Sequence, residues 1–478
     1  MTLIQLFKNI RPFVSPYKWL VVFTLSLTLI GSLIAQVNAW ILRYTVDTIN
    51  GLVEAHKIAA EGLKVLTTIS VILITKEVIN AFIQYGQKHY GEKLRIFVSR
   101  DLAQTVIEKI LTYKLAFYSL RDNQPGRLQS RIDRGIESLT QLVQNFFIDI
   151  LPLFANSIVA LFMMFNANFY VGLVGLCIVP IYFYIAQIQA KKMRGSRRRI
   201  RELRENKSQG ILGILESIAV IKSFIRENIE GQKQMNLQNT LTGTQMETRN
   251  ISFLFDAFKS FIEQIGVVII IILTAYFVLK GEMTIGAIMF HILLFNNVSA
   301  PIRQLHRIYG EMNDALIYSE SFFEILKADS QIELSGDYKT DKIHGKFDLI
   351  NVNFTYPDNE VRTLYDINME VLPGKITALV GLSGAGKSTL INLLDKFYQT
   401  DSGSILLDGI PLSEYDTAFL RENIGLVLQK NHIFNGTVEE NIRYGNPEAT
   451  YEEVIEAAKK SYIHEQIMTL PRQYQTSP

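Results

Sequence analysis

The 478-residue sequence predicts two unlike domains, an all-α transmembrane domain of six helices followed by an incomplete α/β domain. Hydrophobic residues make up 48% of the chain and charged residues only 20%, proportions that favour a membrane protein. Long apolar segments fill the first two thirds. In the last third, short strand-like runs are expected at 347–356, 376–381, 404–409 and 424–429, with helical patterns between some of them. We therefore expect a transmembrane domain over 1–325, a linker over 326–346 and the α/β domain over 347–478.

Six segments approach the roughly 20 apolar residues that a membrane-spanning helix needs. They are residues 19–42, 63–85, 146–165, 169–188, 261–279 and 284–305. The connections at 166–168 and 280–283 are very short, while long polar stretches of helical character separate the second segment from the third and the fourth from the fifth. One side of the membrane therefore has short turns, and the other has long helical extensions.

The basic run KKMRGSRRRIRELRENK, residues 191–207, indicates which side is cytoplasmic. The positive-inside rule places this run and the N-terminus in the cytoplasm, and an even number of spans returns the last third there. We expect a multi-pass protein of the cell membrane. A nucleic-acid patch is the alternative for the run, but a net charge of +2 gives no support for nucleic acid as a partner. The single cysteine, Cys177, cannot build a disulfide framework.

Polar side chains within the expected spans either line a substrate path, or join helices by hydrogen bonds or extend from span ends toward the membrane surface. They are Lys76, Glu77, Glu263, Gln264, His291, Asn296 and Asn297. Both interpretations remain open, and these residues by themselves name no substrate.

The stretch GLSGAGKST, residues 381–389, fits the glycine-rich phosphate-binding pattern called the P-loop. The apolar run ITALV precedes it and the helical pattern KSTLINLLDKF follows it, so the setting is strand, loop and helix. Glycines let backbone N–H groups point at phosphates, and the helix N-terminus adds the positive end of its dipole. Lys387 would reach the β- and γ-phosphates of a nucleotide, and the Ser388 hydroxyl would hold Mg²⁺.

Two further residues fit a nucleotide site. Gln429 ends the apolar run IGLVL, and ligands of an open parallel sheet lie at the carboxyl ends of its strands. Its amide would contact Mg²⁺ and a water beside the γ-phosphate. Tyr356, in the stretch FTYP, would stack on adenine, or it packs as an ordinary aromatic at a strand end. The sequence leaves these two roles of Tyr356 open.

Taken together, these stretches resemble the ATP-binding cassette exporters of the half-transporter kind, such as the bacterial lipid and multidrug exporters. The resemblance covers nearly the whole chain. FTYP is similar to the family's adenine-stacking loop, GLSGAGKST to its Walker A loop, and VLQKNHIFNGTVEENI (427–442) to its Q-loop segment. FYSLRDNQPGRLQSRI (117–132) and LESIAVIKSFIREN (215–228) resemble the two intracellular loops that bear coupling helices.

The resemblance implies ATP and Mg²⁺ as ligands and assigns roles to particular residues. The phosphates would be bound by Gly381, Leu382, Ser383, Gly384, Ala385, Gly386, Lys387, Ser388 and Thr389. Mg²⁺ would be held by Ser388 and Gln429, adenine would stack on Tyr356, and catalysis would use Lys387 and Gln429. The coupling loops would act through Arg121, Asp122, Asn123, Gln124, Pro125, Gly126, Ser223, Phe224, Arg226 and Glu227.

Two ATP sites shared between two nucleotide-binding domains are part of the resemblance. It therefore implies a second half-transporter as partner, either an identical chain or a related one, within the lipid bilayer. The cargo is expected to be hydrophobic or amphipathic: a lipid, a drug-like compound, a peptide or a glycoconjugate. That the cargo is exported, and not imported, follows from the resemblance alone.

The family also uses an LSGGQ-type signature, a Walker B strand with a catalytic Glu, and a switch histidine, all beyond the Q-loop glutamine. None of these follows Gln429 in the printed sequence, which ends at residue 478. We therefore expect a fragment of an ATP-driven exporter that lacks the general base for hydrolysis. The alternatives are a non-hydrolysing, membrane-anchored nucleotide-binding regulator, a decayed transporter, or a membrane-tethered P-loop kinase.

Overall fold

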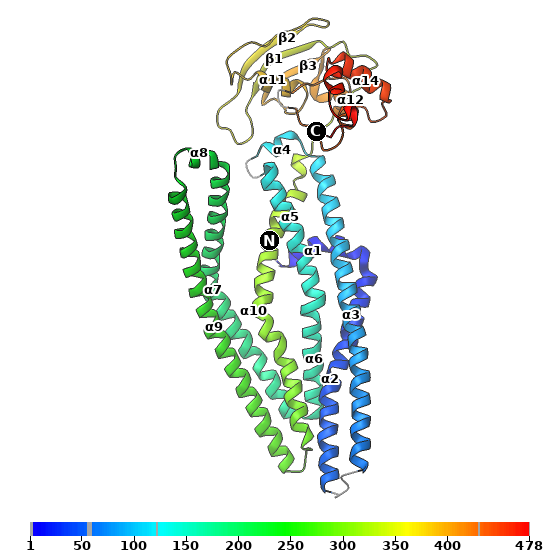
Figure 1. Cartoon of the computed structure of the whole chain (residues 1–478), viewed down its shortest axis with the longest axis vertical. Helices are drawn as coiled ribbons and strands as arrows, with labels where there is room; N and C mark the ends of the chain where they lie inside the picture. Colours follow the sequence, from blue (N-terminus) through cyan, green and yellow to red (C-terminus); the bar gives the residue numbers. More distant parts are fainter. Residues whose placement is uncertain (1–2, 55–59, 121–122, 429–430, 478) are drawn as a thin grey trace. The chain divides into compact units, whose positions relative to one another are not determined.

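A computed structural model of the chain describes residues 3–54, 60–120, 123–428 and 431–477. The chain divides into two compact units (Figure 1). The first, called here the helical unit, comprises residues 1–113 and 117–332. The second, called the sheet unit, comprises residues 114–116 and 333–478.

Long helices joined by short ones build the helical unit. Its elements are α1 (Leu3–Val14), η1 (Ser15–Tyr17), α2 (Lys18–Glu54), α3 (Ala60–Leu111), the part of α4 (Leu115–Ser119) from residue 117 on, α5 (Pro125–Gln144), the π-helix η3 (Asn145–Ile150), α6 (Leu151–Ala167), α7 (Phe169–Glu216), α8 (Ile218–Ser223), α9 (Glu227–Leu279), α10 (Gly286–Leu326) and η4 (Asp329–Gln331). Asn168 is the whole turn between α6 and α7, and its side-chain oxygen accepts hydrogen bonds from the N–H groups of Tyr170 and Val171. This cap satisfies two of the N–H groups that a helix start leaves without a partner.

Helix α2 turns its polar side chains inward and its large apolar side chains outward. A buried stripe, spaced every four residues, consists of Thr24, Thr28, Ser32 and Gln36. The exposed face carries Leu25, Leu29, Leu33 and Trp40. Small side chains let helices approach closely, and outward leucines suit lipid contact. This distribution is the reverse of a water-soluble core and indicates a helix that faces lipid.

Two hydrophobic clusters hold the helical unit together. One joins α1, α3, α5 and α10 and includes the fully buried Leu94, Leu139 and Phe322. The other joins α6, α7, α9 and α10 and includes the fully buried Tyr182 and Ile270. Helix α10 contributes to both clusters, so it connects the two groups of helices.

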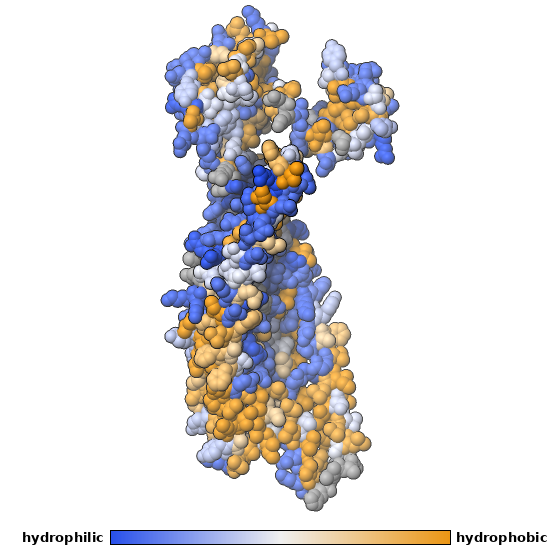
Figure 2. Space-filling view, turned by 60° about the vertical axis from the view of Figure 1, so that its left-hand side comes forward, coloured by the Kyte–Doolittle hydropathy of each residue, from blue (hydrophilic) through white to orange (hydrophobic). Residues whose placement is uncertain are grey.

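Five helical stretches among the described residues are long and apolar enough to cross a membrane. They are Ile4–Glu54, Gly62–Leu111, Pro125–Ala167, Phe169–Met193 and Glu227–Leu279. The first five expected spans fall within these stretches, and most of the sixth, 284–305, lies in α10. A count of six spans stays a prediction. Figure 2 shows hydrophobic side chains covering the end of the helical unit that carries the short turns.

The sheet unit contains a small antiparallel sheet and several short helices. Its elements are β1 (Phe347–Phe354), β2 (Leu364–Val371), α11 (Lys387–Leu394), β3 (Ser402–Leu407), β4 (Ile410–Pro411), η5 (Leu412–Glu414), α12 (Thr417–Glu422), α13 (Val438–Arg443), α14 (Tyr451–Lys460), α15 (His464–Met468) and η6 (Gln473–Gln475). The strand order is β2-β1-β3-β4, and each neighbouring pair is antiparallel. Leu349 and Val352 of β1 are buried in one cluster with Leu390 and Leu393 of α11. The helix that follows the P-loop is therefore held by the core of the sheet unit.

Two of the four expected strands are absent from the described residues. The runs at 347–356 and 404–409 contain β1 and β3, as predicted. The run at 376–381 and the described part of the run at 424–429 form no strand, and Ile376, Val380 and Val427 are almost fully exposed. A strand exists only where a neighbour pairs its N–H and C=O groups, and no described residue pairs with either run. Both strand expectations are therefore wrong for the part of the chain that the structure describes.

Part of the expected linker is bound to the sheet unit. The N–H of Gly336 donates to the Tyr415 carbonyl at 3.1 Å, and the N–H of Tyr338 donates to the Glu414 carbonyl at 2.9 Å. These two hydrogen bonds place 336–338 beside the turn after β4 instead of in a free connection.

Candidate functional site

The P-loop has the backbone conformation that its glycines favour. Gly384 and Gly386 have φ angles of +85° and +83°, in the left-handed region that residues with a Cβ seldom adopt. A Cβ added at Gly386 would also lie only 2.6 Å from Cδ2 of Leu364 on β2. The sequence therefore needs glycine at 386 both for the turn and for packing of the loop against the sheet.

Helix α11 begins at Lys387, directly after the loop, and leaves its first N–H groups available. Gly386 is the N-cap residue, and no side chain caps this end of α11. The ammonium Nζ of Lys387 donates to the carbonyl oxygens of Gly381 and Leu382 at 2.9 and 2.7 Å, so it lies inside the loop. The Ser388 side chain is exposed. Uncapped N–H groups, a helix N-terminus and an ammonium in one loop fit the negative charge of a phosphate.

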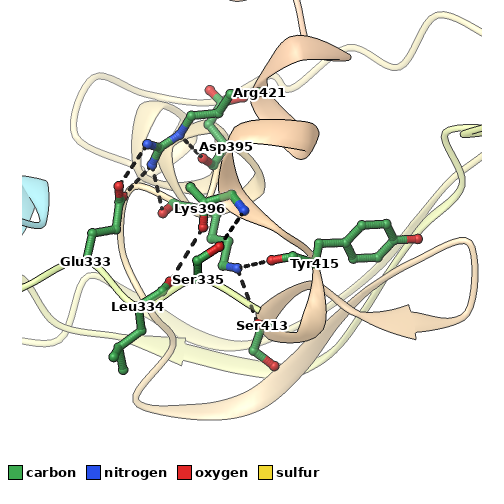
Figure 3. A network of polar contacts seen from close by, with 9 residues as sticks. Glu333, Leu334, Ser335, Asp395, Lys396, Ser413, Tyr415 and Arg421 are labelled. Carbon is green, nitrogen blue, oxygen red and sulfur yellow. Dashed lines mark hydrogen bonds and ion pairs between the residues drawn. The ribbon is translucent and has the colours of Figure 1, made fainter. Parts of the chain in front are cut away.

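The opposite end of α11 is fixed by a network of polar contacts (Figure 3). Arg421 on α12 donates to both carboxylate oxygens of Glu333, at 3.0 and 2.6 Å, and to the Lys396 carbonyl at 3.3 Å. The Lys396 ammonium, which is buried, donates to the carbonyls of Tyr415 and Ser413. These contacts hold the residues after α11 against α12 and against the chain at residue 333, so the helix cannot shift away from the sheet easily.

Burial perturbs two charged groups in this network. It raises the pKa of the Asp395 carboxyl, an effect that the nearby Arg421 partly offsets. It lowers the pKa of the Lys396 ammonium. Lys396 also has a φ of +58°, which is unusual for a residue with a Cβ. The buried charges of Asp395 and Lys396 and the strained backbone of Lys396 therefore lie directly after the C-terminal end of α11.

Tyr356 lies beside the P-loop helix. Its hydroxyl donates to Oγ1 of Thr389 at 3.1 Å, and the amide of Asn392 donates to that hydroxyl at 3.4 Å. Its half-buried ring meets Phe354 and Tyr398 edge to face, with centroids 4.9 and 5.2 Å apart. The structure thus brings Tyr356 and Thr389 together, two residues that lie far apart in the sequence.

Three of the expected site residues lie outside the described part of the chain. They are Gln429, Arg121 and Asp122. The expected roles of these residues therefore remain predictions.

The described part of the first expected coupling loop is tied to α10. Asn123 is buried, and its side-chain oxygen accepts a hydrogen bond from Nη1 of Arg131 on α5 at 2.8 Å. Arg131 also donates to Oγ of Ser321 at 2.6 Å and pairs with Glu324, both on α10. Gln124, Pro125 and Gly126 follow at the start of α5. Sequence reasoning missed Arg131, although a basic residue near a loop of polar residues was visible.

The second expected coupling loop is a short helix with an exposed apolar tip. Helix α8 ends at Ser223, and Phe224 and Ile225 beyond it are 69% and 84% exposed. Lys222 pairs with Glu227 at 2.9 Å and lowers the pKa of that carboxyl, while the N–H of Arg226 donates to the Ile221 carbonyl. Figure 1 shows α4 and α8 at the same end of the helical unit, opposite the turns between α6 and α7 and between α9 and α10.

Several polar residues of the expected spans join helices to one another. The buried carboxylate of Glu263 on α9 accepts a hydrogen bond from Ser299 on α10 at 2.6 Å and pairs with Arg303. Asn297 on α10 donates to Gln36 on α2 at 3.1 Å. For Glu263 and Asn297, these contacts favour the interhelical role over a substrate path.

Comparisons with known proteins agree with this architecture. Residues 21–302 match the ABC transporter transmembrane region, and residues 364–476 match the ABC transporter family. A multidrug export ATP-binding/permease protein of Staphylococcus aureus is 30% identical over 98% of this chain and 81% of its own length. The protein YgaD of Bacillus subtilis, named in the same way, is 28% identical over 98% of this chain and 80% of its own length.

A solved structure has the same fold. The structure of a bacterial Atm1-family ABC exporter with ATP bound matches with a TM-score of 0.80 and 23% identity, over 96% of this chain and 80% of that one. The match to the transmembrane family spans more than half of the chain, and the P-loop of the sheet unit lies within the match to the second family. The chain therefore belongs to the ATP-binding cassette transporters and has the fold of their exporters.

Proposed function

We propose that this chain is one half of an ATP-driven exporter that moves a hydrophobic or amphipathic molecule out of the cell. The proposal rests on one observation, that a single chain contains two particular parts. One part is a P-loop with an uncapped helix start and an inward-pointing Lys387. The other is a helical unit whose long helices carry exposed large apolar side chains, with a buried polar stripe on α2. A membrane-tethered kinase or a regulator would not need so many spanning helices.

In the proposed nucleotide-binding site, residues 381–389 bind the phosphates. ATP supplies the energy of binding and hydrolysis, and Mg²⁺ held by Ser388 and Gln429 would reduce phosphate repulsion. Lys387 would exchange its two loop carbonyl partners for the β- and γ-phosphate oxygens, and the uncapped N–H groups of α11 would donate to the remaining oxygens. The glycines keep the backbone close enough for these contacts.

Tyr356 stays the proposed adenine-stacking residue. Its hydroxyl bond to Thr389 keeps it beside the phosphate-binding loop, which supports the proposal. Its edge-to-face contacts with Phe354 and Tyr398 fit the alternative, in which Tyr356 only completes the core of the sheet unit.

The proposed route from nucleotide to membrane passes through the two loops. The segments 121–126 and 223–227 would dock on nucleotide-binding domains, so that clamping of ATP moves the helices to which they belong. The exposed apolar side chains of Phe224 and Ile225 support this role, since a surface of this kind is stabilised by a partner. The Arg131 contacts with α10 would pass a movement of the first loop directly to that helix.

The proposed partner is a second half-transporter, either identical or related, and the proposed cargo class includes drug-like compounds. Export of such compounds is what the names of the Staphylococcus aureus and Bacillus subtilis relatives state for those proteins. A lipid, a peptide or a glycoconjugate is a further candidate for this chain.

Removal of the Lys387 charge tests the nucleotide site. We expect Lys387→Met to weaken ATP binding by the purified chain about tenfold or more, because a charged hydrogen bond to phosphate is lost. Binding is measured by the fluorescence of a nucleotide analogue, which needs no hydrolysis. Lys375→Met is the matched control, since Lys375 is exposed and lies outside the loop. Equal affinities for the native chain and Lys387→Met would contradict the proposal.

A further inference from the structure

The chain leaves the helical unit and enters the sheet unit through a single peptide bond between two anchored residues. Ile332 is the last residue of the helical unit, and Glu333 begins the main part of the sheet unit. Neither residue lies in a free connection, although the sequence predicts a linker over 326–346. Consecutive Cα atoms are only about 3.8 Å apart, so this junction has no length with which to absorb a movement of either residue.

Contacts within the helical unit fix the junction on the side of Ile332. Ile332 pairs with Tyr113 in an isolated antiparallel bridge and packs against the cluster that contains the end of α10. The Tyr113 hydroxyl donates to the Ile325 carbonyl of α10. Lys109 of α3 pairs with Asp329 of η4 at 2.5 Å. Residue 332 and the end of α10 are therefore expected to move together.

Contacts within the sheet unit fix the junction on the side of Glu333 (Figure 3). Both carboxylate oxygens of Glu333 accept hydrogen bonds from Arg421 of α12, at 3.0 and 2.6 Å. Such a two-point contact sets orientation as well as distance. Two residues further on, Oγ of Ser335 accepts a hydrogen bond from the N–H of Thr417 at 2.9 Å. A movement of Glu333 is therefore passed to α12.

The same Arg421 guanidinium also contacts three successive residues at the end of α11. Its Nε approaches the Asp395 carbonyl at 3.5 Å, and its Nη2 donates to the Lys396 carbonyl at 3.3 Å. Its Cζ lies 4.8 Å from the centroid of the Phe397 ring. A cation is favourable at a helix C-terminus, where carbonyls lack partners. Because α11 has only eight residues, a shift of this end reaches the P-loop at the other.

The groups around Arg421 include buried charge and an unusual backbone angle. Oδ2 of Asp395 is buried and has no hydrogen-bond partner in the described part of the chain. Lys396 is also buried and has a φ of +58°. Apolar side chains would fill such space without the cost of desolvating charge, and backbone strain is often retained at functional sites. These features favour a positioning role for the network over a role in stability alone.

We propose that Arg421 is a positioning residue of the nucleotide site, and that its ion pair with Glu333 couples this site to the end of α10. The route runs from the P-loop along α11 to Arg421, then to Glu333 and across one peptide bond to Ile332. The inference rests on the proposed binding of ATP at residues 381–389, and it adds a route that uses neither coupling loop. ATP that holds one end of α11 would thereby reduce motion at residue 332.

Hydrogen exchange at residues 329–332 of the full chain, with and without saturating ATP and Mg²⁺, tests the coupling. The N–H groups of Gln331 and Ile332 donate to carbonyls three residues earlier, so their exchange reports local opening of η4. We expect ATP to slow this exchange about fivefold in the native chain, a modest coupling between sites. Glu333→Ala should abolish the slowing while ATP remains bound, which a fluorescent nucleotide analogue verifies.

Further variants separate positioning from stability. Arg421→Ala should weaken ATP binding about fivefold, because the end of α11 loses the contacts of the guanidinium. Arg421→Lys keeps the charge without the two-point contact and should recover part of both the affinity and the slowing. Glu422→Ala removes an exposed carboxylate on the same helix and should change neither quantity. Asp408→Asn, which weakens the sheet unit away from this network, should also leave both intact.

The outcomes distinguish the inference from the proposed function. ATP binding by the native chain with unchanged exchange at 329–332, or slowing that survives in Glu333→Ala, would overturn the inference and leave nucleotide binding standing. Equal losses of affinity in Asp408→Asn and Arg421→Ala would show that Arg421 acts through stability alone. If Arg421→Ala does not fold, Arg421→Lys and Glu333→Ala still decide the question. A native chain that binds no ATP would overturn the proposed function, and this inference with it.

Discussion

Helix α2 of the helical unit and strand β1 of the sheet unit bury opposite kinds of side chain. Helix α2 buries Thr28 and Ser32 and exposes Leu29, whereas β1 buries Leu349 and Val352. The buried positions of α2 recur every four residues, whereas Leu349 and Val352 are three residues apart because β1 has a register shift between them. The difference teaches that the two units were selected for different surroundings, lipid for one and water for the other. An exchange between a polar and an apolar side chain should therefore have opposite consequences in α2 and in β1.

The largest effect is expected where the start of α10 packs against the backbone of α2. A Cβ at Gly286 would lie 2.4 Å from the Arg43 carbonyl oxygen and 2.7 Å from Oδ1 of Asp47, which accepts the Gly286 N–H. Gly286→Ala should lower the free energy of unfolding by about 3 kcal/mol, because α10 must move away from α2. Thermal unfolding of the chain in detergent measures this change.

The matched control is Gly243→Ala on α9. Gly243 is exposed, and a Cβ there meets no atom within 4 Å. This variant should be neutral or slightly stabilising, because alanine favours a helix over glycine. If both variants behaved alike, the close approach of α2 and α10 would not stabilise the fold.

A smaller effect is expected from exchanging a methyl group and a hydroxyl in the two cores. Val352→Thr places an additional hydroxyl in the core of the sheet unit and should destabilise the chain by about 1–2 kcal/mol. Thr28→Val makes the reverse exchange in α2. The Thr28 hydroxyl is buried and has no hydrogen-bond partner in the described part of the chain, so its loss should be neutral or stabilising. Denaturant unfolding compares the pair, and a loss of stability in Thr28→Val would break the comparison.

The smallest effect concerns Asp408, in the turn after β3. Burial alone would raise the pKa of its carboxyl, but hydrogen bonds from the N–H groups of His344 at 2.7 Å and Lys346 at 2.9 Å outweigh burial and hold the pKa below its usual value. A lowered pKa means that this carboxylate stabilises the fold above the unfolded-state pKa, near 4, and that the contribution disappears as the pH falls through the folded-state pKa.

Asp408→Asn should therefore lower stability by about 1 kcal/mol at pH 7, a modest value because the group is only partly buried. The difference from the native chain should shrink below pH 4. Amide hydrogen exchange at 344–346, corrected for the intrinsic rate at each pH, measures it. A difference that stayed constant from pH 7 to pH 3 would show that the carboxylate charge is not responsible.

The sequence predicted features that depend on local pattern and missed those that depend on contacts between segments far apart in the chain. Local apolar length placed five spans, and the P-loop pattern placed the start of α11 at Lys387. The strand at 376–381 was predicted wrongly because apolar content cannot show whether a neighbouring strand is present to pair with it. The pairing of Tyr356 with Thr389 depends on the tertiary fold, which local patterns do not specify.

The central claim is that ATP held at residues 381–389 moves the helical unit through its two cytoplasmic loops. Hydrogen exchange of the full chain, with and without ATP and Mg²⁺, tests it without requiring hydrolysis. We predict that ATP slows exchange in α8 and at 123–126 in the native chain and leaves both segments unchanged in Lys387→Met. ATP that binds at the P-loop of the native chain, yet alters exchange in neither segment, would contradict the claim.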